Sequence, residues 1–362
     1  MEMQTTDLLP EYSFSGFKLN SLEDTEKLYV WYKKPQGGQI VEFNFPKTIT
    51  IDSRFIQNLA LYIGDGLNNP SKINTHCNFS NNNLDLIKLI YDWWLELGIQ
   101  KEKINVYACT SEGDMQEIEN IIKNKIKCEK VKVYVYPLHR IPTIIIQIGN
   151  SIFQAFFLNL FTNLKSKIFA DVILRRAFLT GLFAAEGHVK HSVYGTIESI
   201  SYAFNPKTEL ALAKFVCDCL SLENITAKIS KGQVYFCNYA QMLRFFLRGI
   251  INLHKNKKIK FEKLIKNADV TLHFNQKFLE KAINKNISQH KLAKNIGCSQ
   301  ASISHNLTIS RFKLKLLPKI CPNITRESLV ENTEYAQVSN SRISDKEAIT
   351  FLINIQLDNK ND

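Results

Sequence analysis

The chain has 362 residues, 45% of them hydrophobic, so it is long enough to bury more than one core. Lys and Arg outnumber Asp and Glu by 46 to 34, which gives a formal net charge of +12. This excess favours a polyanionic partner such as nucleic acid, the alternative being a charge that serves solubility alone. The polar, acidic start is not a secretory signal, and the eight scattered cysteines lack zinc or dithiol spacing. We therefore expect an intracellular protein of the cytoplasm or an organellar matrix.

Residues 1–50 are expected to form an N-terminal extension. Two strand-like segments, 27–34 and 39–45, flank Gly37 and Gly38, which is typical of a β-hairpin. Further along, the most apolar stretch of the chain, 143–161, is interrupted by four polar Asn and Gln residues. It predicts a strand leading into a core helix, with no membrane partner.

An internal repeat organises the middle of the chain, with copies at 51–168 and 169–270. Residues 55–66 and 177–187 are apolar helical runs, each ending in a small residue, a carboxylate and Gly, so that Asp65 corresponds to Glu186. A second helix near 84–92 is echoed near 210–218. Strand-like segments lie at 72–80, 105–110, 131–136, 143–149, 196–205, 227–230 and 233–238. Each copy is predicted to run helix, strand pair, helix, strand pair, helix, an α+β plan.

Small residues on the two apolar helices predict a tight crossing. They lie four apart, at Ala60 and Gly64 and at Gly181 and Ala185, on one face of each helix. Packing there would bring Asp65 and Glu186 together, each followed by a Gly suited to a left-handed cap. Two carboxylates at the negative ends of two helices repel each other unless a divalent cation joins them, and oxygen ligands suit Mg²⁺. For either helix alone, an ordinary capped end is the alternative.

The segments NLALYIGDG (58–66) and LTGLFAAEG (179–187) resemble the two motifs of double-motif LAGLIDADG homing endonucleases. The resemblance covers about residues 55–267. It implies two pseudo-symmetric αββαββα halves that form a DNA-binding saddle, with Asp65 and Glu186 as metal ligands. It also implies a monomer that cleaves double-stranded DNA with Mg²⁺, for which Mn²⁺ substitutes, and no small-molecule cofactor. Ile63 and Ala184 stand where the motif has its first acid, a variable position that packs rather than cleaves.

The same resemblance places basic residues near the scissile phosphates. The matching neighbourhoods contain Lys167 and Lys258, which become candidates for stabilising transition-state charge. A solvated basic loop is the alternative for each lysine.

Strict alternation over residues 72–80 predicts a strand with one polar face suited to base edges in the major groove. That face contains Lys72, Asn74, His76, Asn78 and Ser80. In the second copy His188 and Lys190 begin the matching region, where the alternation is blurred. A solvent-facing sheet edge is the alternative.

Residues 275–318 are expected to form a small all-α helix-turn-helix domain. Leu292, Ala293 and Ile303 supply the apolar seam, Gly297 the turn and Ser299 the N-cap of the second helix. The residues left to enter a groove are Gln300, Ser302, Ser304 and His305. A plain helical hairpin is the alternative. Residues 319–362 are expected to form a mostly polar tail with a helix near 346–355.

The sequence leaves several functions open. The first is a site-specific DNA endonuclease, favoured because both acids are present. The second is a non-cleaving regulator, because some bacterial regulators combine a LAGLIDADG-like body with a helix-turn-helix. The third is an RNA-splicing maturase, for which the sequence offers no discriminating residue.

Overall fold

The protein, described here by a computed structural model, is an α+β chain with several small sheets. The structure describes residues 1–13, 15–34, 38–66, 76–111, 115–136, 142–275, 278, 282 and 288–358. These fall into two compact units. Unit 1 contains residues 1–187 and 205–211, and unit 2 contains residues 188–204 and 212–362. Within the described residues, no helix is long and apolar enough to cross a membrane.

Unit 1 begins with the expected hairpin, enlarged by short neighbouring strands. β3 (Lys27–Lys33) and β4 (Ile40–Pro46) pair antiparallel, and β2 (Asn20–Glu23) adds a third strand. β1 (Glu2–Gln4) pairs with β5 (Thr48–Thr50), next to the short 3-10 helix η1 (Thr5–Leu8). Leu28, Val30 and Tyr32 alternate along β3 and are buried, which is the two-residue period of a half-buried strand.

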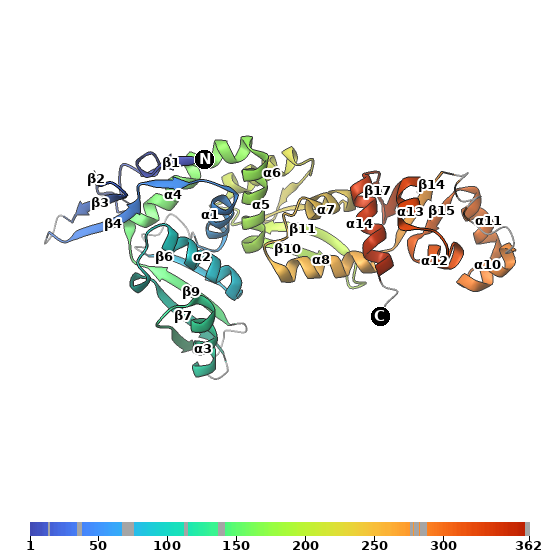
Figure 1. Cartoon of the computed structure of the whole chain (residues 1–362), viewed down its shortest axis with the longest axis horizontal. Coiled ribbons are helices and arrows are strands. Elements are labelled where there is room, and N and C mark those ends of the chain that lie inside the picture. The colour runs from blue at the N-terminus through green and yellow to red at the C-terminus, as the bar shows by residue number, and fades with distance from the viewer. Residues whose placement is uncertain are drawn as a thin grey trace. The chain divides into compact units, whose positions relative to one another are not determined.

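The first repeat copy follows in unit 1 (Figure 1). Its elements are α1 (Ser53–Asp65), β6 (Cys77–Asn81), α2 (Leu84–Glu96), η2 (Lys101–Lys103), β7 (Asn105–Thr110), α3 (Met115–Ile126), β8 (Lys132–Val135), β9 (Thr143–Ile148) and α4 (Ser151–Ala170). The predicted strand leading into a core helix over 143–161 is confirmed by β9 and α4, whose N-cap Asn150 accepts from Ile152 and Phe153 amides. Buried aromatic rings from α1, α2 and α4 pack together, with the Tyr62 and Phe157 centroids 4.5 Å apart.

The second copy starts with α5 (Val172–Glu186), which packs along α1 and so belongs to unit 1. It continues with β10 (Gly187–His191), β11 (Ile197–Ala203), α6 (Leu210–Leu222), β12 (Lys228–Ser230), β13 (Gln233–Phe236), α7 (Tyr239–Leu247) and α8 (Lys255–Asn267). The strand order is β10-β11-β13-β12, and in the first copy it is β6-β9-β7-β8. The run β11-β13-β12 in the second copy corresponds to the run β6-β9-β7 in the first copy. This shared order supports the internal repeat.

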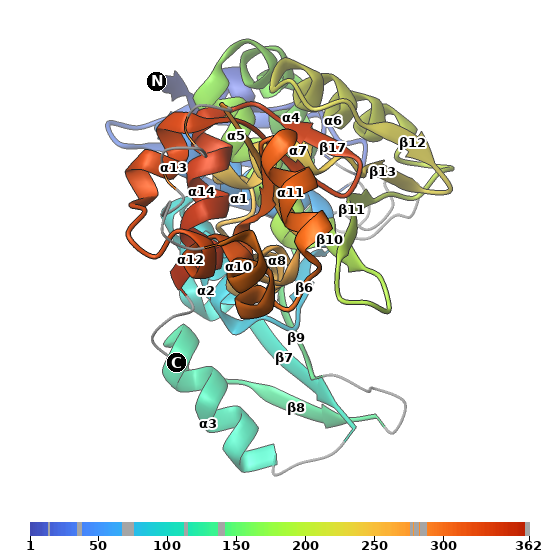
Figure 2. The same cartoon turned by 90° about the vertical axis from the view of Figure 1, so that its right-hand side faces the viewer.

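The first copy differs from the predicted plan by an insertion between β7 and β9. α3 was not predicted, and β8 pairs parallel with β7, whereas β9 pairs antiparallel with it (Figure 2). A parallel pair needs a crossover connection, and α3 supplies it. Ile118, Ile122 and Ile126 recur every four residues along this segment, which is a helical period in a chain region otherwise predicted as strands.

The C-terminal part of unit 2 contains a sheet that the sequence did not predict. β14 (Val270–Phe274), β15 (Arg311–Lys313), β16 (Thr333–Val338) and β17 (Ser341–Ile343) pair antiparallel in the order β15-β14-β16-β17. Between them lie α10 (Gln289–Ile296), α11 (Gln300–Thr308), η3 (Leu314–Leu316), α12 (Leu317–Ile320) and α13 (Arg326–Asn332), and α14 (Lys346–Leu357) closes the chain.

Two expectations are corrected by this sheet. The helix-turn-helix is flanked by strands rather than forming an all-α domain, and the described part of the expected polar tail, residues 319–358, is folded. Each of these strands has only one to three buried residues, such as Leu272 in β14 and Ala336 in β16, which is too short an apolar alternation to stand out in the sequence. The helix expected near 346–355 is confirmed by α14.

Candidate functional site

α1 and α5 cross at the four small residues predicted for this contact. A Cβ added to Gly64 would lie 2.4 Å from the Cβ of Ala185, and one added to Gly181 would lie 2.0 Å from the backbone oxygen of Gln57 and 3.0 Å from the Cβ of Ala60. The contacts run in the same order along both helices, so their C-terminal ends lie together. No larger side chain fits at this crossing.

The crossing brings Asp65 and Glu186 to one place. The Cγ of Glu186 is 3.3 Å from the position of a Cβ on Gly64, the residue before Asp65. Both acids are half-buried and end their helices, where backbone carbonyls add negative potential. The side-chain amide of Asn81 donates a 2.6 Å hydrogen bond to Asp65. Asn81, which ends β6, was missed because only the fold brings it to α1.

The glycines after the acids act differently from the prediction. Gly66 has φ −113° and Gly187 has φ −74°, so neither adopts the left-handed cap conformation. A Cβ on Gly66 would lie 2.4 Å from the ring of Tyr62, and one on Gly187 would lie 2.2 Å from the ring of Phe183. These positions need glycine because an aromatic ring one turn earlier fills the space.

Of the two candidate lysines, Lys167 lies away from this acidic pair within unit 1, and Lys258 belongs to unit 2. Lys167 lies near the C-terminal end of α4, where its Nζ is 3.3 Å from the sulfur of Met3 and 3.6 Å from that of Met1. α5 starts five residues later and is 15 residues long, so Glu186 is about 20 Å away along the helix axis. Lys258 belongs to α8 of unit 2, with its Nζ 4.0 Å from Glu262.

The polar face predicted for residues 72–80 is described only in part. Lys72 and Asn74 lie outside the described residues. His76 is exposed, and Asn78 and Ser80 of β6 are half-buried on the face opposite the buried Cys77 and Phe79. Asn78 stands opposite Gln147 of β9, so this sheet of unit 1 carries a polar outer face.

In unit 2 the start of β10 carries a group of basic side chains. His188 and Lys190 are exposed, and Lys190 forms a 2.9 Å ion pair with Glu198. Partial burial lowers the pKa of His188, and the nearby ammonium groups of Lys260 and Lys257 on α8 lower it further. The two α8 lysines were not singled out from the sequence, because nothing there shows that they face β10.

The helix-turn-helix has the predicted local geometry. α10 ends at Gly297 with φ 70°, and Ser299 caps α11 by accepting from the amide of Ser302 at 3.1 Å. Leu292, Ala293 and Ile303 are buried between the two helices and their neighbours. The side chains of α11 predicted to enter a groove all lie on its exposed side: Gln300, Ser302, Ser304 and His305.

The C-terminal sheet presents a second cationic surface beside α11, here called the basic sheet face. Its cations, on strands β15 and β17, are Arg311, Lys313 and Arg342, all exposed. The register puts Arg311 opposite His273, and His273 opposite Tyr335. The His273 and Tyr335 rings stack at 4.1 Å, and the Arg342 guanidinium lies 3.9 Å from the Tyr335 ring centre. Stacking of this kind holds a cation over the sheet.

A hollow of about 480 Å³ joins the basic sheet face to the helix-turn-helix. Asn306 of α11 lines it together with Arg311, Lys313 and Gln337. Lys313 is engaged by Asp269 at 2.6 Å. Arg311 and Arg342 are therefore the cations of this face best placed to meet an outside anion.

Comparison with known proteins gives a partial match. The model of a LAGLIDADG-like domain matches residues 174–297, from α5 to the turn between α10 and α11, so this region is LAGLIDADG-like. No curated protein matches. The crystal structure of full-length DUF199/WhiA from Thermatoga maritima is similar over 72% of this chain and 90% of that chain, at 15% identity and a TM-score of 0.33. A similarity of that degree carries no conclusion on function.

Proposed function

We propose that the protein binds a specific duplex DNA sequence and acts as a regulator without cutting it. The exposed polar side of α11, held over a buried apolar seam, carries the proposal. A second helix presented in this way enters the major groove, where Gln and Ser side chains hydrogen-bond to base edges. The LAGLIDADG-like match over residues 174–297 and the net charge of +12 are in keeping with it.

The basic sheet face adds the contacts that position such a helix. Phosphate contacts fix the register of a protein on DNA, and they come mostly from Arg and Lys. Arg311 follows α11 by three residues, and Asn306 of α11 lines the same hollow. We assign phosphate contacts to Arg311 and Arg342 and base contacts to Gln300 and Ser304.

The test starts from genomic fragments that the full-length protein selects. Gln300→Ala is expected to lower affinity for a selected fragment roughly tenfold or more and to leave binding to unrelated duplex unchanged. Asn354→Ala, at an exposed position on α14, is the matched control and should change neither. The proposal is wrong if no fragment is enriched, or if Gln300→Ala weakens binding to both kinds of DNA equally.

A metal-dependent endonuclease is the second candidate, favoured by the meeting of Asp65 and Glu186. Their oxygen donors fit Mg²⁺, which when bound supplies Lewis-acid activation of a phosphate and of water. Within the chain itself, Asn81 holds one Asp65 oxygen and orients that carboxylate. Lys167, a candidate for charge stabilisation, lies at the opposite end of α5 from Glu186, which favours the regulator over the endonuclease.

Cleavage is checked on the same selected fragments, incubated with Mg²⁺ and separately with Mn²⁺. A regulator leaves them intact while binding them. The endonuclease becomes the better function if the natural protein cuts these fragments, and if Asp65→Asn and Glu186→Gln each abolish cutting but retain binding. Selection of RNA rather than DNA would instead favour the maturase.

A further inference from the structure

Three tyrosine rings form a row on one face of the sheet in unit 1. β8 pairs in parallel with β7, and the register puts Tyr107 opposite Lys132 and Cys109 opposite Tyr134. Residues paired across two strands lie on the same face of a sheet, and alternation along the chain puts Tyr136 on that face as well. The Tyr134 ring centre lies 6.1 Å from that of Tyr107 and 6.3 Å from that of Tyr136, at interplanar angles of 32° and 37°. These three side chains are called the tyrosine row below.

The rings of the tyrosine row can be reached from solvent. Tyr134 is 40% exposed and Tyr136 is 49% exposed, and Tyr107 is half-buried. Tyr134 lies on β8 and Tyr136 directly follows it, and β8 is the strand that the insertion with α3 adds to the first copy (Figure 2). Two of the three rings therefore belong to the insertion rather than to the fold that both copies share.

A hollow of about 390 Å³ adjoins the tyrosine row at the start of β7 and β8. Tyr107 of the row lines it, next to Asn105 of the same strand. Its charged lining consists of three lysines and two glutamates: Lys101, Lys130, Lys132, Glu102 and Glu129. The row and the hollow therefore combine exposed aromatic rings with a small excess of cations.

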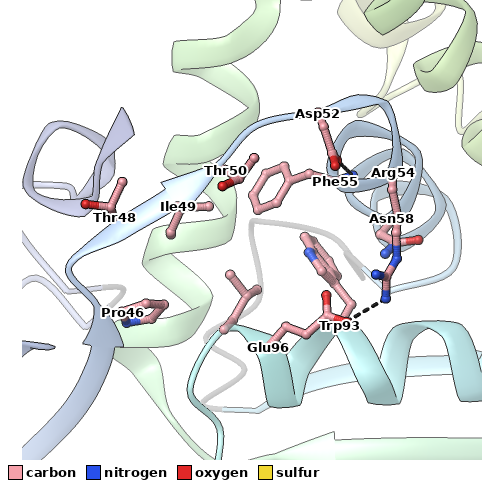
Figure 3. Close-up of a pocket in the computed structure, with 11 residues that line it drawn as sticks. Pro46, Thr48, Ile49, Thr50, Asp52, Arg54, Phe55, Asn58, Trp93 and Glu96 are labelled. Atoms are coloured by element: carbon pink, nitrogen blue, oxygen red, sulfur yellow. Dashed lines mark hydrogen bonds and ion pairs between the residues drawn. The ribbon is translucent and has the colours of Figure 1, made fainter. Parts of the chain in front are cut away.

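The three lysines of this hollow are open to an outside anion. None of them forms an ion pair with another described residue. On α3, by contrast, Lys125 is held in an ion pair by Asp85. In the hollow beside the start of α1, Arg54 is the one cation among the described lining residues, and a 2.6 Å ion pair with Glu96 engages it (Figure 3). Uncommitted cations beside aromatic rings thus distinguish the hollow at β7 and β8.

We infer that the tyrosine row and this hollow bind a single-stranded nucleic acid. An unpaired base has open faces, and stacking on an exposed aromatic ring covers such a face whichever base it is. In a duplex the neighbouring base pairs already cover these faces, so the rings have little to offer paired DNA. The lysine ammonium groups beside the rings meet the phosphates that join successive bases. This inference is independent of the proposed duplex recognition by the helix-turn-helix, since all of its residues belong to unit 1.

The experiment titrates the full-length protein into a fluorescein-labelled oligothymidylate of about 8 nucleotides and follows the anisotropy. Saturable binding is expected. An abasic oligonucleotide of the same length carries the same phosphates without bases and should bind at least roughly tenfold more weakly. Oligouridylate is titrated in parallel, and the ratio of the two affinities assigns the site to DNA or to RNA. Saturation by neither, or equal binding of the abasic and the ordinary strand, would overturn the inference.

Variants of the middle ring test the stacking. Tyr134→Thr removes the ring but keeps a residue that favours strands, and it is expected to weaken oligothymidylate binding roughly fivefold or more. Tyr134→Phe keeps the ring face and should bind within about twofold of the natural protein. Tyr12→Thr is the matched control, because Tyr12 is a 49% exposed tyrosine of unit 1 outside this sheet, and it should change nothing.

Lys132→Gln tests the charge and does not depend on the folding of the Tyr134 variants. It is expected to lower the slope of log affinity against log salt by about 0.7, the value for one phosphate contact on a single strand. Lys125→Gln removes the same charge from the ion pair with Asp85 and should leave the slope unchanged. Equal slopes for both lysine variants would contradict a phosphate contact at the hollow.

Two further outcomes would overturn the inference. In the first, Tyr134→Thr weakens oligothymidylate binding no more than Tyr12→Thr does. In the second, Tyr134→Thr weakens the binding of a duplex of the same length by the same factor, which would mean that the row contacts paired DNA. None of these measurements uses a selected genomic fragment, so a failure of the proposed regulator leaves them unaffected.

Discussion

Gly181 and Gly64 show how single atoms determine the α1–α5 crossing. Gly181 faces a backbone oxygen, which cannot turn away, whereas Gly64 faces the methyl group of Ala185. The two glycines therefore differ in what a substitution can displace, although both lie in helices where Ala is intrinsically the better residue by about 1 kcal/mol.

Gly181→Ala is expected to lower the free energy of unfolding by about 1–3 kcal/mol through overpacking, against its gain in helix propensity. Gly64→Ala should cost less, and adding Ala185→Gly should restore most of the loss because the methyl group merely changes sides. Urea unfolding of the three variants measures this. Equal stability of Gly181→Ala and the natural protein would contradict the close approach.

His254 is a pH-sensitive cap of α8. Its ring nitrogen Nδ1 accepts from the amide of Lys257 at 3.4 Å, and partial burial with the Lys257 ammonium lowers its pKa to about 4. The folded pKa lies below the ordinary 6.5, so the unfolded chain binds the extra proton. The stabilisation is present above pH 6.5 and is lost as pH falls toward 4.

His254→Asn keeps a capping acceptor that does not titrate. Between pH 7 and 5 the natural protein is expected to lose roughly 1 kcal/mol more stability than this variant, allowing for solvent screening of a half-exposed ring. Denaturant midpoints at the two pH values measure the difference. If both proteins lose the same stability between pH 7 and pH 5, His254 is not the cause of the pH dependence.

The strands of unit 2 depend on chain segments far apart in sequence. β14 pairs with β16, which lies about sixty residues later, and the Gln356 amide of α14 donates to the backbone oxygens of Ile265 and Ala268 at 3.2 and 2.7 Å. β16 and α14, within residues 333–357, are therefore part of the folded core of unit 2.

Deleting residues 319–362 is expected to remove partners of β14 and to unfold the surrounding sheet. Hydrogen exchange at residues 270–274 should then lose its protection, and the truncated chain should no longer bind selected DNA. Deleting only 359–362, outside the described residues, is the control and should leave both unchanged. Retained protection in the longer deletion would show that the strands after β14 are dispensable.

The sequence predicted elements wherever a local pattern was long enough. The duplicated motif helices, α2, α6 and the helix-turn-helix follow from apolar periodicity and caps such as Ser299. The α3–β8 insertion and the C-terminal sheet did not follow, because their strands are short and pair across long separations. The same limit applies to the site, where Asn81, Lys260 and Arg342 gain their neighbours only through the fold.

The whole molecule is a cationic chain whose charges are unevenly committed. Lys313 and Arg326 are held by Asp269 and Asp358 at 2.6 Å, whereas Arg342 rests on an aromatic ring. A cation that must first leave an ion pair loses part of the binding free energy that its contact with a phosphate would supply. Net charge alone therefore does not identify the cations that meet DNA.

The salt dependence of DNA binding distinguishes the cations that contact DNA from those held in ion pairs. Arg311→Gln and Arg342→Gln are each expected to lower the slope of log affinity against log salt by about 1, to a similar degree on all duplexes. Arg326→Gln removes the same charge from an existing ion pair and is expected to leave the slope unchanged. Fluorescence anisotropy across a salt series measures the three slopes. Identical slopes for all variants would mean that the basic sheet face is not in the contact.

α5 belongs to the second copy of the repeat by its sequence, but it packs against α1 of the first copy. If the chain were divided at the repeat boundary, each fragment would expose an apolar helix that has lost its packing partner. The first fragment would expose Leu59 of α1, and the second would expose Phe178 and Leu179 of α5. Fragments 1–168 and 169–362 are therefore expected to associate when they are coexpressed, and each is expected to aggregate when it is produced alone. The α1–α5 contact therefore joins the first copy of the repeat to the first helix of the second.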